Sequence, residues 1–243
     1  MIRYLVLSSF LFIFSHTALA VCKVNDFVIG AEYKITTTKK NDNRSNTRHL
    51  ILWRNGRQAA HQLSETGITE VWEQTNNGLL RLVRYFDNHQ HGIEYQPNEI
   101  NNGKGDKSWD MKSQLITNKL IKLMQKKSVK GKGCKKTAYY TLKSNNKIIN
   151  LNWLTQQRLV KSYSETSDSS KIKWELVRIT TDKKQINDIF SARSNYQTTD
   201  YADIGDNESD PFLMKMINLG FVEHGASGFY DAKGNTLKAH HQH

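Results

Sequence analysis

An alternation of apolar and polar residues with a period of two runs through most of the chain, from residue 27 to residue 179. It is clearest where Ile149, Leu151 and Trp153 alternate with asparagines. Successive side chains of an extended strand point to opposite faces, so this pattern predicts a half-buried strand with one wet face. Tight-turn residues such as Asn55 and Gly56 separate the predicted strands and favour hairpins between them. The sequence therefore predicts a mainly β protein with a curved antiparallel meander sheet.

A few segments depart from this alternation. Apolar residues at helical spacing predict one embedded helix over residues 113–125, with Ser113 as its cap. The lysine-rich run that follows, residues 126–136, is interpreted as a solvated loop. Near the C-terminus, Asp210 precedes Pro211 and Gly220 follows the last apolar position, which predicts a short C-terminal helix between them.

The first twenty residues have the composition of a secretory signal peptide. Arg3 precedes an apolar run, and Ala18-Leu19-Ala20 forms a small-residue cleavage site. The apolar run is shorter than the about 20 residues that a permanent membrane helix needs. We therefore expect a periplasmic or secreted protein after cleavage near Ala20, a compartment that excludes ATP-driven chemistry and argues against nucleic acid as a partner. The expected parts are a signal peptide (1–20), an antiparallel β domain (21–190), and an acidic linker, short helix and histidine-containing tail (191–243).

Cys22 and Cys134 are the only two cysteines. In an oxidising compartment such a pair is expected to form a disulfide, here between the mature N-terminus and the middle of the chain. The alternative is lipidation, because residues 19–22 resemble the site at which bacterial lipoproteins are processed. Val21 is larger than the small residue that this processing prefers just before the cysteine. The disulfide is the favoured prediction and the lipoprotein stays open.

The chain has a formal net charge of +12. Outside the cytoplasm such a charge favours an anionic membrane surface or an acidic partner. The other interpretation is that a basic surface serves only solubility.

Four tryptophans are the candidate ligand-binding residues. As large aromatic side chains they are suited to lining an apolar cavity, and the alternative is that they belong to the ordinary core. They are Trp53, Trp72, Trp153 and Trp174.

The histidines raise a metal hypothesis of a different class. Asp87, His89 and His91 share strand parity, which would direct all three side chains toward one ion. Asn88 and Gly92 favour a turn instead, and then the group is a polar hairpin tip.

Two further segments contain candidate ligands for metals. The tail histidines at 240, 241 and 243 would bind zinc or copper as a flexible tract, or simply end the chain. The acids between residues 200 and 210 supply oxygen ligands of the kind Ca²⁺ prefers, or else they favour the start of the helix that follows them. No residue is assigned here as a metal ligand.

Catalytic motifs give no support for an enzyme. The sequence contains no His-Glu-x-x-His, no Gly-x-Ser-x-Gly and no phosphate-binding glycine loop. We assign no catalytic residue and expect no cofactor.

Three stretches resemble the C-terminal strands of periplasmic lipoprotein-localisation carriers: residues 151–165, residues 173–179 and residues 186–190. The resemblance implies a half-open β-barrel in which helices plug an apolar cavity that holds an acyl chain. The family's usual proline after the tryptophan strand is replaced by Arg158-Leu159. The leading hypothesis is a non-enzymatic periplasmic protein that binds a lipid or other apolar ligand, such as an outer-membrane-related carrier. The alternative is a zinc- or copper-associated periplasmic protein that uses the tail or the 89/91 pair.

Overall fold

The computed structural model describes residues 28–40, 44–101, 103–207 and 209–221, together with the backbone of two short strands, β13 (Phe229–Tyr230) and β14 (Thr236–Leu237). The predicted signal peptide, Cys22 and the tail histidines lie outside the described residues. The disulfide and the cleavage site therefore stay predictions.

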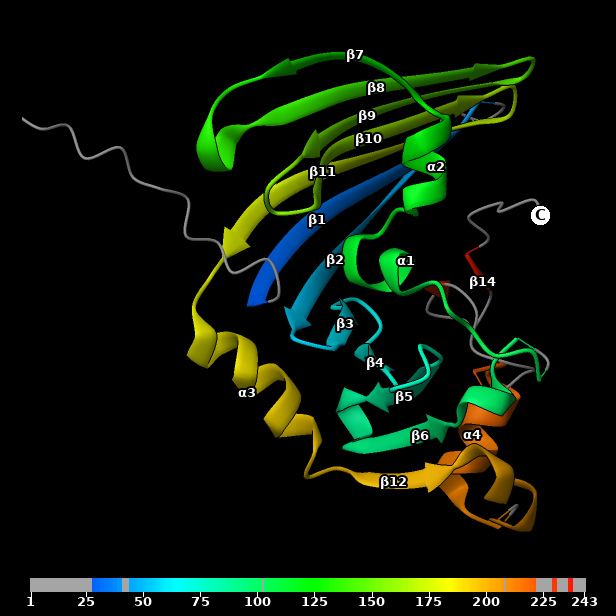
Figure 1. Cartoon of the computed structure of the whole chain (residues 1–243). Coiled ribbons are helices and arrows are strands. Elements are labelled where there is room, and N and C mark those ends of the chain that lie inside the picture. The colour runs from blue at the N-terminus through cyan, green and yellow to red at the C-terminus, as the bar shows by residue number, and fades with distance from the viewer. Residues whose placement is uncertain are drawn as a thin grey trace, which may run out of the picture.

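One twelve-stranded sheet forms the body of the protein, in the order β12-β6-β5-β4-β3-β2-β1-β11-β10-β9-β8-β7. Neighbouring strands are antiparallel except β12, which runs parallel to β6. The sheet curves and does not close, and β7 and β12 lie at its opposite edges (Figure 1). This confirms the predicted mainly β fold with a curved, half-open meander. The strands are β1 (Val28–Lys39), β2 (Ser45–Asn55), β3 (Gln58–Leu63), β4 (Ile68–Gln74), β5 (Leu80–Phe86), β6 (His91–Tyr95), β7 (Gln125–Lys130), β8 (Thr137–Ser144), β9 (Lys147–Leu154), β10 (Leu159–Ser167), β11 (Ser170–Thr180) and β12 (Gln197–Asp200).

Helices cover both faces of the sheet (Figure 1). We call inner the face that α1 (Trp109–Gln114) and α2 (Asn118–Leu123) cover, and outer the face against which α3 (Lys183–Arg193) packs. On the outer face, Ile186 of α3 is fully buried in a cluster with Trp53. Gly30 makes this possible, because a Cβ there would lie 2.5 Å from Trp53 Cζ3.

The inner face holds two apolar clusters. The larger one lies on β1, β2 and β8–β11 and is centred on fully buried residues such as Leu52 and Leu151. The smaller one lies on β4–β6, where α4 (Pro211–Asn218) contributes Leu213 and Met216. None of the helices in the described part of the chain has the length and apolar character that crossing a bilayer requires.

The C-terminal helix begins and ends as its sequence predicts. Asp210 accepts hydrogen bonds from the backbone N–H groups of Phe212 and Leu213, and Pro211 occupies the first turn. A proline at this position costs no hydrogen bond, since the first amides of a helix have no partner within it.

Three local predictions were wrong. The helix expected over 113–125 is two short helices, because Leu115 adopts a left-handed conformation (φ 64°) and Thr117 caps a new start. Part of the expected lysine loop is the edge strand β7, a place where exposed lysines are tolerated. Residues 186–190, which the resemblance placed in a strand, lie in α3, which begins after its cap Asp182.

Candidate apolar-ligand site

The inner face is unevenly covered. Near its middle the apolar side chains are fully buried, whereas toward β8, β10, β11 and α2 a continuous set of them is only partly buried. We call this set the half-buried surface. Its members are Ile35, Leu120, Ile121, Tyr140, Leu142, Tyr163, Trp174 and Leu176.

Strand register brings these side chains together. Trp174 is paired with Ile35 on one side and with Tyr163 on the other, so the three form a row across β1, β11 and β10. The Tyr163 and Trp174 rings lie 5.3 Å apart, centroid to centroid. On β8, Leu142 is opposite Ile149 of β9, which belongs to the same cluster. The half-buried surface is therefore one continuous apolar patch rather than scattered residues.

Polar groups lie at one end of this patch. The hydroxyl of Tyr163 donates a hydrogen bond to Glu165 Oε2 at 2.6 Å, and Lys147 Nζ lies 2.8 Å from Glu165 Oε1. Burial raises the pKa of the Tyr163 hydroxyl, and its hydrogen bond to Glu165 raises that pKa further. The phenol therefore stays protonated and is able to donate at any physiological pH.

Helix α2 covers part of the patch with only six residues. Leu120 and Ile121 pack against the inner cluster, while Leu123 is 64% exposed beside the exposed Lys122. The helix therefore has apolar side chains toward the sheet and also toward water.

The four predicted tryptophans do not share one site. Trp153 is buried and Trp174 partly buried in the same inner cluster. Trp72 lies in the second inner cluster, where Lys112 Nζ is 3.7 Å from the centre of its ring. Trp53 lies on the outer face, and its Nε1 donates to Gln62 Oε1 at 2.9 Å. The structure thus brings two of the four together.

Asp87, His89 and His91 do not form the metal site that was considered for them, and they lie at a turn, as the alternative had it. Residues 87–89 make a 3-10 turn, so their side chains do not alternate between two faces as they would in a strand. Asp87 Oδ2 accepts from Arg193 Nη2 at 2.7 Å. His91 lies at 2.8 Å from Thr199 Oγ1 and stacks on Phe212 with 4.2 Å between ring centres.

The rest of the chain that the structure describes offers no metal site either. Within it, no group of three or more His, Cys, Asp or Glu side chains is placed to hold an ion. Two acids of the 200–210 stretch instead accept backbone hydrogen bonds, Asp200 from Ala202 and Asp210 at the start of α4. The tail histidines lie outside the described residues.

A row of buried polar side chains crosses β3, β4 and β5 on the inner face, and the sequence analysis missed it. Arg84 is fully buried and donates from Nε and Nη2 to Glu70 Oε1 at 3.0 and 2.8 Å. Its Nη1 donates to the Phe221 carbonyl at 2.6 Å. His61 Nε2 donates to the Lys112 carbonyl at 2.7 Å, which ties β3 to α1. Burial lowers the pKa of His61 to about 4.

No protein-family model and no curated protein matches the chain. Among solved structures it is similar to PNGF-II, with 10% sequence identity and a TM-score of 0.33. The match covers 70% of this chain and 31% of PNGF-II. It is also similar to a LolA superfamily protein, NE2245 from Nitrosomonas europaea (6% identity, TM-score 0.29; 65% of this chain, 88% of that one). A third is an outer membrane lipoprotein-sorting protein domain from Vibrio parahaemolyticus (7% identity, TM-score 0.30; 66% and 90%). Lipoprotein-sorting domains are thus among the solved structures to which this chain is similar.

Proposed function

We propose that this is a non-enzymatic periplasmic protein that binds the acyl chain of a lipid, or another apolar ligand, on the half-buried surface. The expected export signal provides the compartment, and the inner face provides the site. One observation supports this proposal most directly. The half-buried surface is a continuous apolar patch that the described part of the protein leaves partly exposed to solvent.

The two faces of β9 differ in polarity. Asn150 and Asn152 of β9 alternate with the apolar inner residues and lie on the outer face. Fully burying a leucine or phenylalanine side chain is worth about 1.5 to 3 kcal/mol relative to leaving it in water. An acyl chain that completes the burial of several members of the patch gains part of that free energy for each of them.

The polar end of the patch indicates an amphipathic ligand. Lys147 and the Tyr163 hydroxyl both contact Glu165 at the border of the apolar surface. A head group is able to bind there while its chain lies along Trp174 and Ile35. The ligand therefore has a preferred direction along the sheet.

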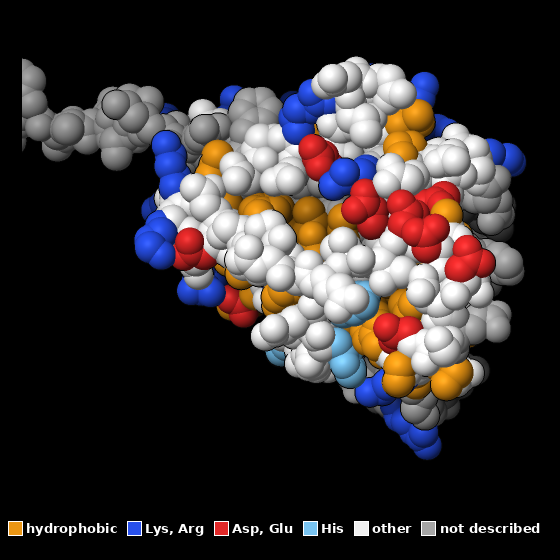
Figure 2. Space-filling view, turned by 90° about the horizontal axis from the view of Figure 1, so that it is seen from below, with side chains coloured by type: hydrophobic (Ala, Val, Ile, Leu, Met, Phe, Trp, Pro, Cys, Tyr) orange, Lys and Arg blue, Asp and Glu red, His pale blue; other side chains and the backbone are white. Residues whose placement is uncertain are grey.

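Charge supports an anionic membrane surface as a partner. Residues 111–164 contain thirteen lysines and arginines and no acid. They include the exposed lysines of α2 and β7, next to the patch. The other end of the sheet has the acids Asp200, Asp203, Asp206 and Asp210, and Figure 2 shows acidic side chains gathered on that side. The basic end would therefore face an anionic lipid surface, with the half-buried surface near it.

The ligand proposal predicts that native mass spectrometry of host-expressed protein finds a bound lipid, and that the delipidated protein binds pyrene-labelled phosphatidylglycerol. Leu142→Gln, on the inner face, should weaken that binding about tenfold, because the apolar contact of one leucine is lost. Pyrene fluorescence titration measures the change.

The matched control is Ile148→Gln. Ile148 belongs to the neighbouring strand, is 43% exposed and lies on the other face of the sheet. It should bind the labelled lipid as the wild type does. A protein that copurifies with nothing apolar and shows no saturable binding, or equal loss in both variants, would contradict the proposal.

The membrane proposal predicts binding to vesicles of phosphatidylcholine and phosphatidylglycerol that disappears when phosphatidylglycerol is omitted. Lys126→Gln combined with Lys127→Gln should lower partitioning about thirtyfold, since each lysine near an anionic surface contributes about 1 kcal/mol. Co-sedimentation at low and high salt measures it. The control pair, Lys171→Gln with Lys183→Gln, removes two exposed lysines elsewhere. Equal losses in both pairs would mean that net charge, not the basic end, drives the binding.

A further inference from the structure

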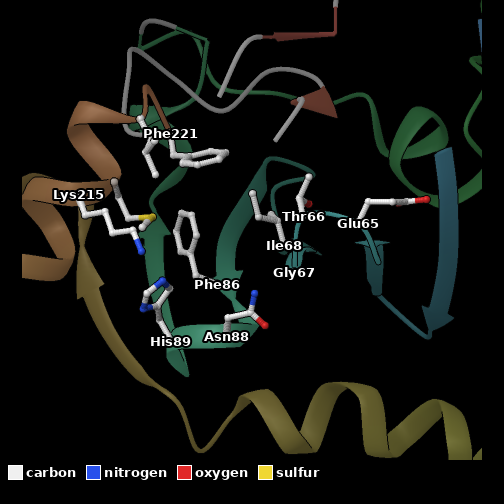
Figure 3. Close-up of a pocket in the computed structure, with 11 residues that line it drawn as sticks. Glu65, Thr66, Gly67, Ile68, Phe86, Asn88, His89, Lys215 and Phe221 are labelled. Atoms are coloured by element: carbon white, nitrogen blue, oxygen red, sulfur yellow. The ribbon is translucent and has the colours of Figure 1, made fainter. Parts of the chain in front are cut away.

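A separate pocket lies at the other end of the inner face, between the β3–β4 turn, the end of β5 and helix α4 (Figure 3). Its volume is about 270 Å³. The pocket belongs to the second apolar cluster and not to the half-buried surface. It therefore calls for its own explanation.

Buried apolar side chains form one part of the pocket wall. Phe86, Met216 and Phe221 line it and are each no more than 5% exposed. The Phe86 and Phe221 rings meet edge to face, 5.6 Å between centroids. Edge-to-face packing of this kind fixes ring orientation, so the walls are preformed.

The rim of the pocket has polar donors. Lys215 comes from α4, and Asn88 and His89 come from the turn after β5. Figure 3 shows the Lys215 ammonium group and the His89 ring on one side of the pocket and Asn88 on the other. In the described part of the chain, no hydrogen bond or ion pair joins any of these three side chains to another residue.

The acid that lines the pocket does not neutralise this rim. Glu65 points away from the other lining side chains in Figure 3. Its Oε1 accepts hydrogen bonds from the backbone N–H of His49 at 2.7 Å and lies 2.9 Å from His49 Nδ1. The side chains of Lys215, His89 and Asn88 are thus left to face a ligand that enters the pocket.

We propose that this pocket binds a small apolar carboxylate. Its aromatic or branched apolar body would lie against Phe86, Met216 and Phe221, and its carboxylate would accept hydrogen bonds from Lys215 and His89. A water molecule occupies about 30 Å³ of the liquid, so the pocket has room for roughly nine waters. That volume fits a ligand made of one aromatic ring and a short side chain. The carboxylate is that of a free organic acid or of a peptide C-terminus.

The test uses the full chain and the probe 3-phenylpropionate, with binding followed by calorimetry and by protein-observed NMR. The neutral analogue 3-phenylpropanamide should bind at least tenfold more weakly. Lys215→Met should weaken 3-phenylpropionate binding about 10- to 100-fold, because a charge-assisted hydrogen bond is lost, and Lys215→Arg should restore most of it. Leu219→Trp, at a partly exposed lining residue, should block the pocket outright.

Two comparisons keep the outcome interpretable. Lys183→Met, at an exposed position of α3, and Leu142→Gln, on the half-buried surface, should leave 3-phenylpropionate binding unchanged. Acetyl-Ala-Phe with a free C-terminus, tested against its amide, separates the sources: tighter binding than 3-phenylpropionate assigns the site to a peptide end, and weaker binding assigns it to a free acid. Equal binding of acid and amide, no saturable binding, or an unaffected Lys215→Met variant would overturn the proposal.

Discussion

Replacing Arg84 by methionine is expected to lower the free energy of unfolding by about 3 to 5 kcal/mol, because it leaves Glu70 as an uncompensated buried charge. Arg84 is fully buried, and Glu70 is 6% exposed. The variant also removes the donor to the Phe221 carbonyl, which lies just beyond α4. The loss therefore spreads from β4 and β5 to the C-terminal helix.

Urea unfolding monitored by circular dichroism and by tryptophan fluorescence measures this loss. Arg81→Met is the matched control, since Arg81 lies on the same strand and its contacts with Glu73 (3.8 Å) and Glu94 (3.4 Å) are exposed or half-exposed. That control should cost less than about 1 kcal/mol. Adding Glu70→Gln to Arg84→Met should recover part of the loss, because the buried charge is then removed too. A cost for Arg84→Met no greater than the cost for Arg81→Met would show that the buried pair is not what stabilises this region.

The fold could be predicted from the sequence because its signal is local. Period-two alternation identifies each strand from its own residues, and turn residues between strands predict hairpins. Together they predict the antiparallel meander. The buried pair of Arg84 and Glu70 has a weaker signal of the same kind. Arg84 alternates along β5 with the same period as Leu82 and Phe86, and all three side chains face inward. A charge at an inward position indicates a buried partner, but naming Glu70 requires the register between β4 and β5.

The candidate site was only partly predictable, for a related reason. Trp153 and Trp174 stand in alternating strands, so their inward direction could be predicted, and the same alternation would have pointed to Tyr140 and Tyr163. Trp53 ends an apolar stretch in which every position is hydrophobic, so parity does not assign it a face. On the outer face its ring lies over Gly30 and packs with α3, which comes more than a hundred residues later in the chain.

The second large effect concerns pH and His61. The pKa of this imidazole is about 4 in the folded protein, with burial as the main cause, whereas the unfolded chain has the ordinary value of about 6.5. Above pH 6.5 the group is neutral in both states and the full stability is present. Between pH 6.5 and pH 4 the unfolded chain binds a proton that the folded protein does not, so stability decreases as the pH falls. At pH 4.5 the expected loss from this group is about 2.5 kcal/mol relative to pH 7.

His61→Gln isolates this contribution from that of the carboxylates, which titrate in the same range. The glutamine amide is able to donate to the Lys112 carbonyl as Nε2 does, but it has no proton to gain. The difference in unfolding free energy between wild type and variant, measured in urea at pH 7 and pH 4.5, should therefore shift by about 2.5 kcal/mol in favour of the variant at the lower pH. Parallel stability curves for the two proteins would show that His61 is protonated as easily in the fold as in water. The hydrogen bond from His61 joins β3 to α1, the helix that precedes α2, so acid is expected to loosen the cover of the inner face as it destabilises the fold.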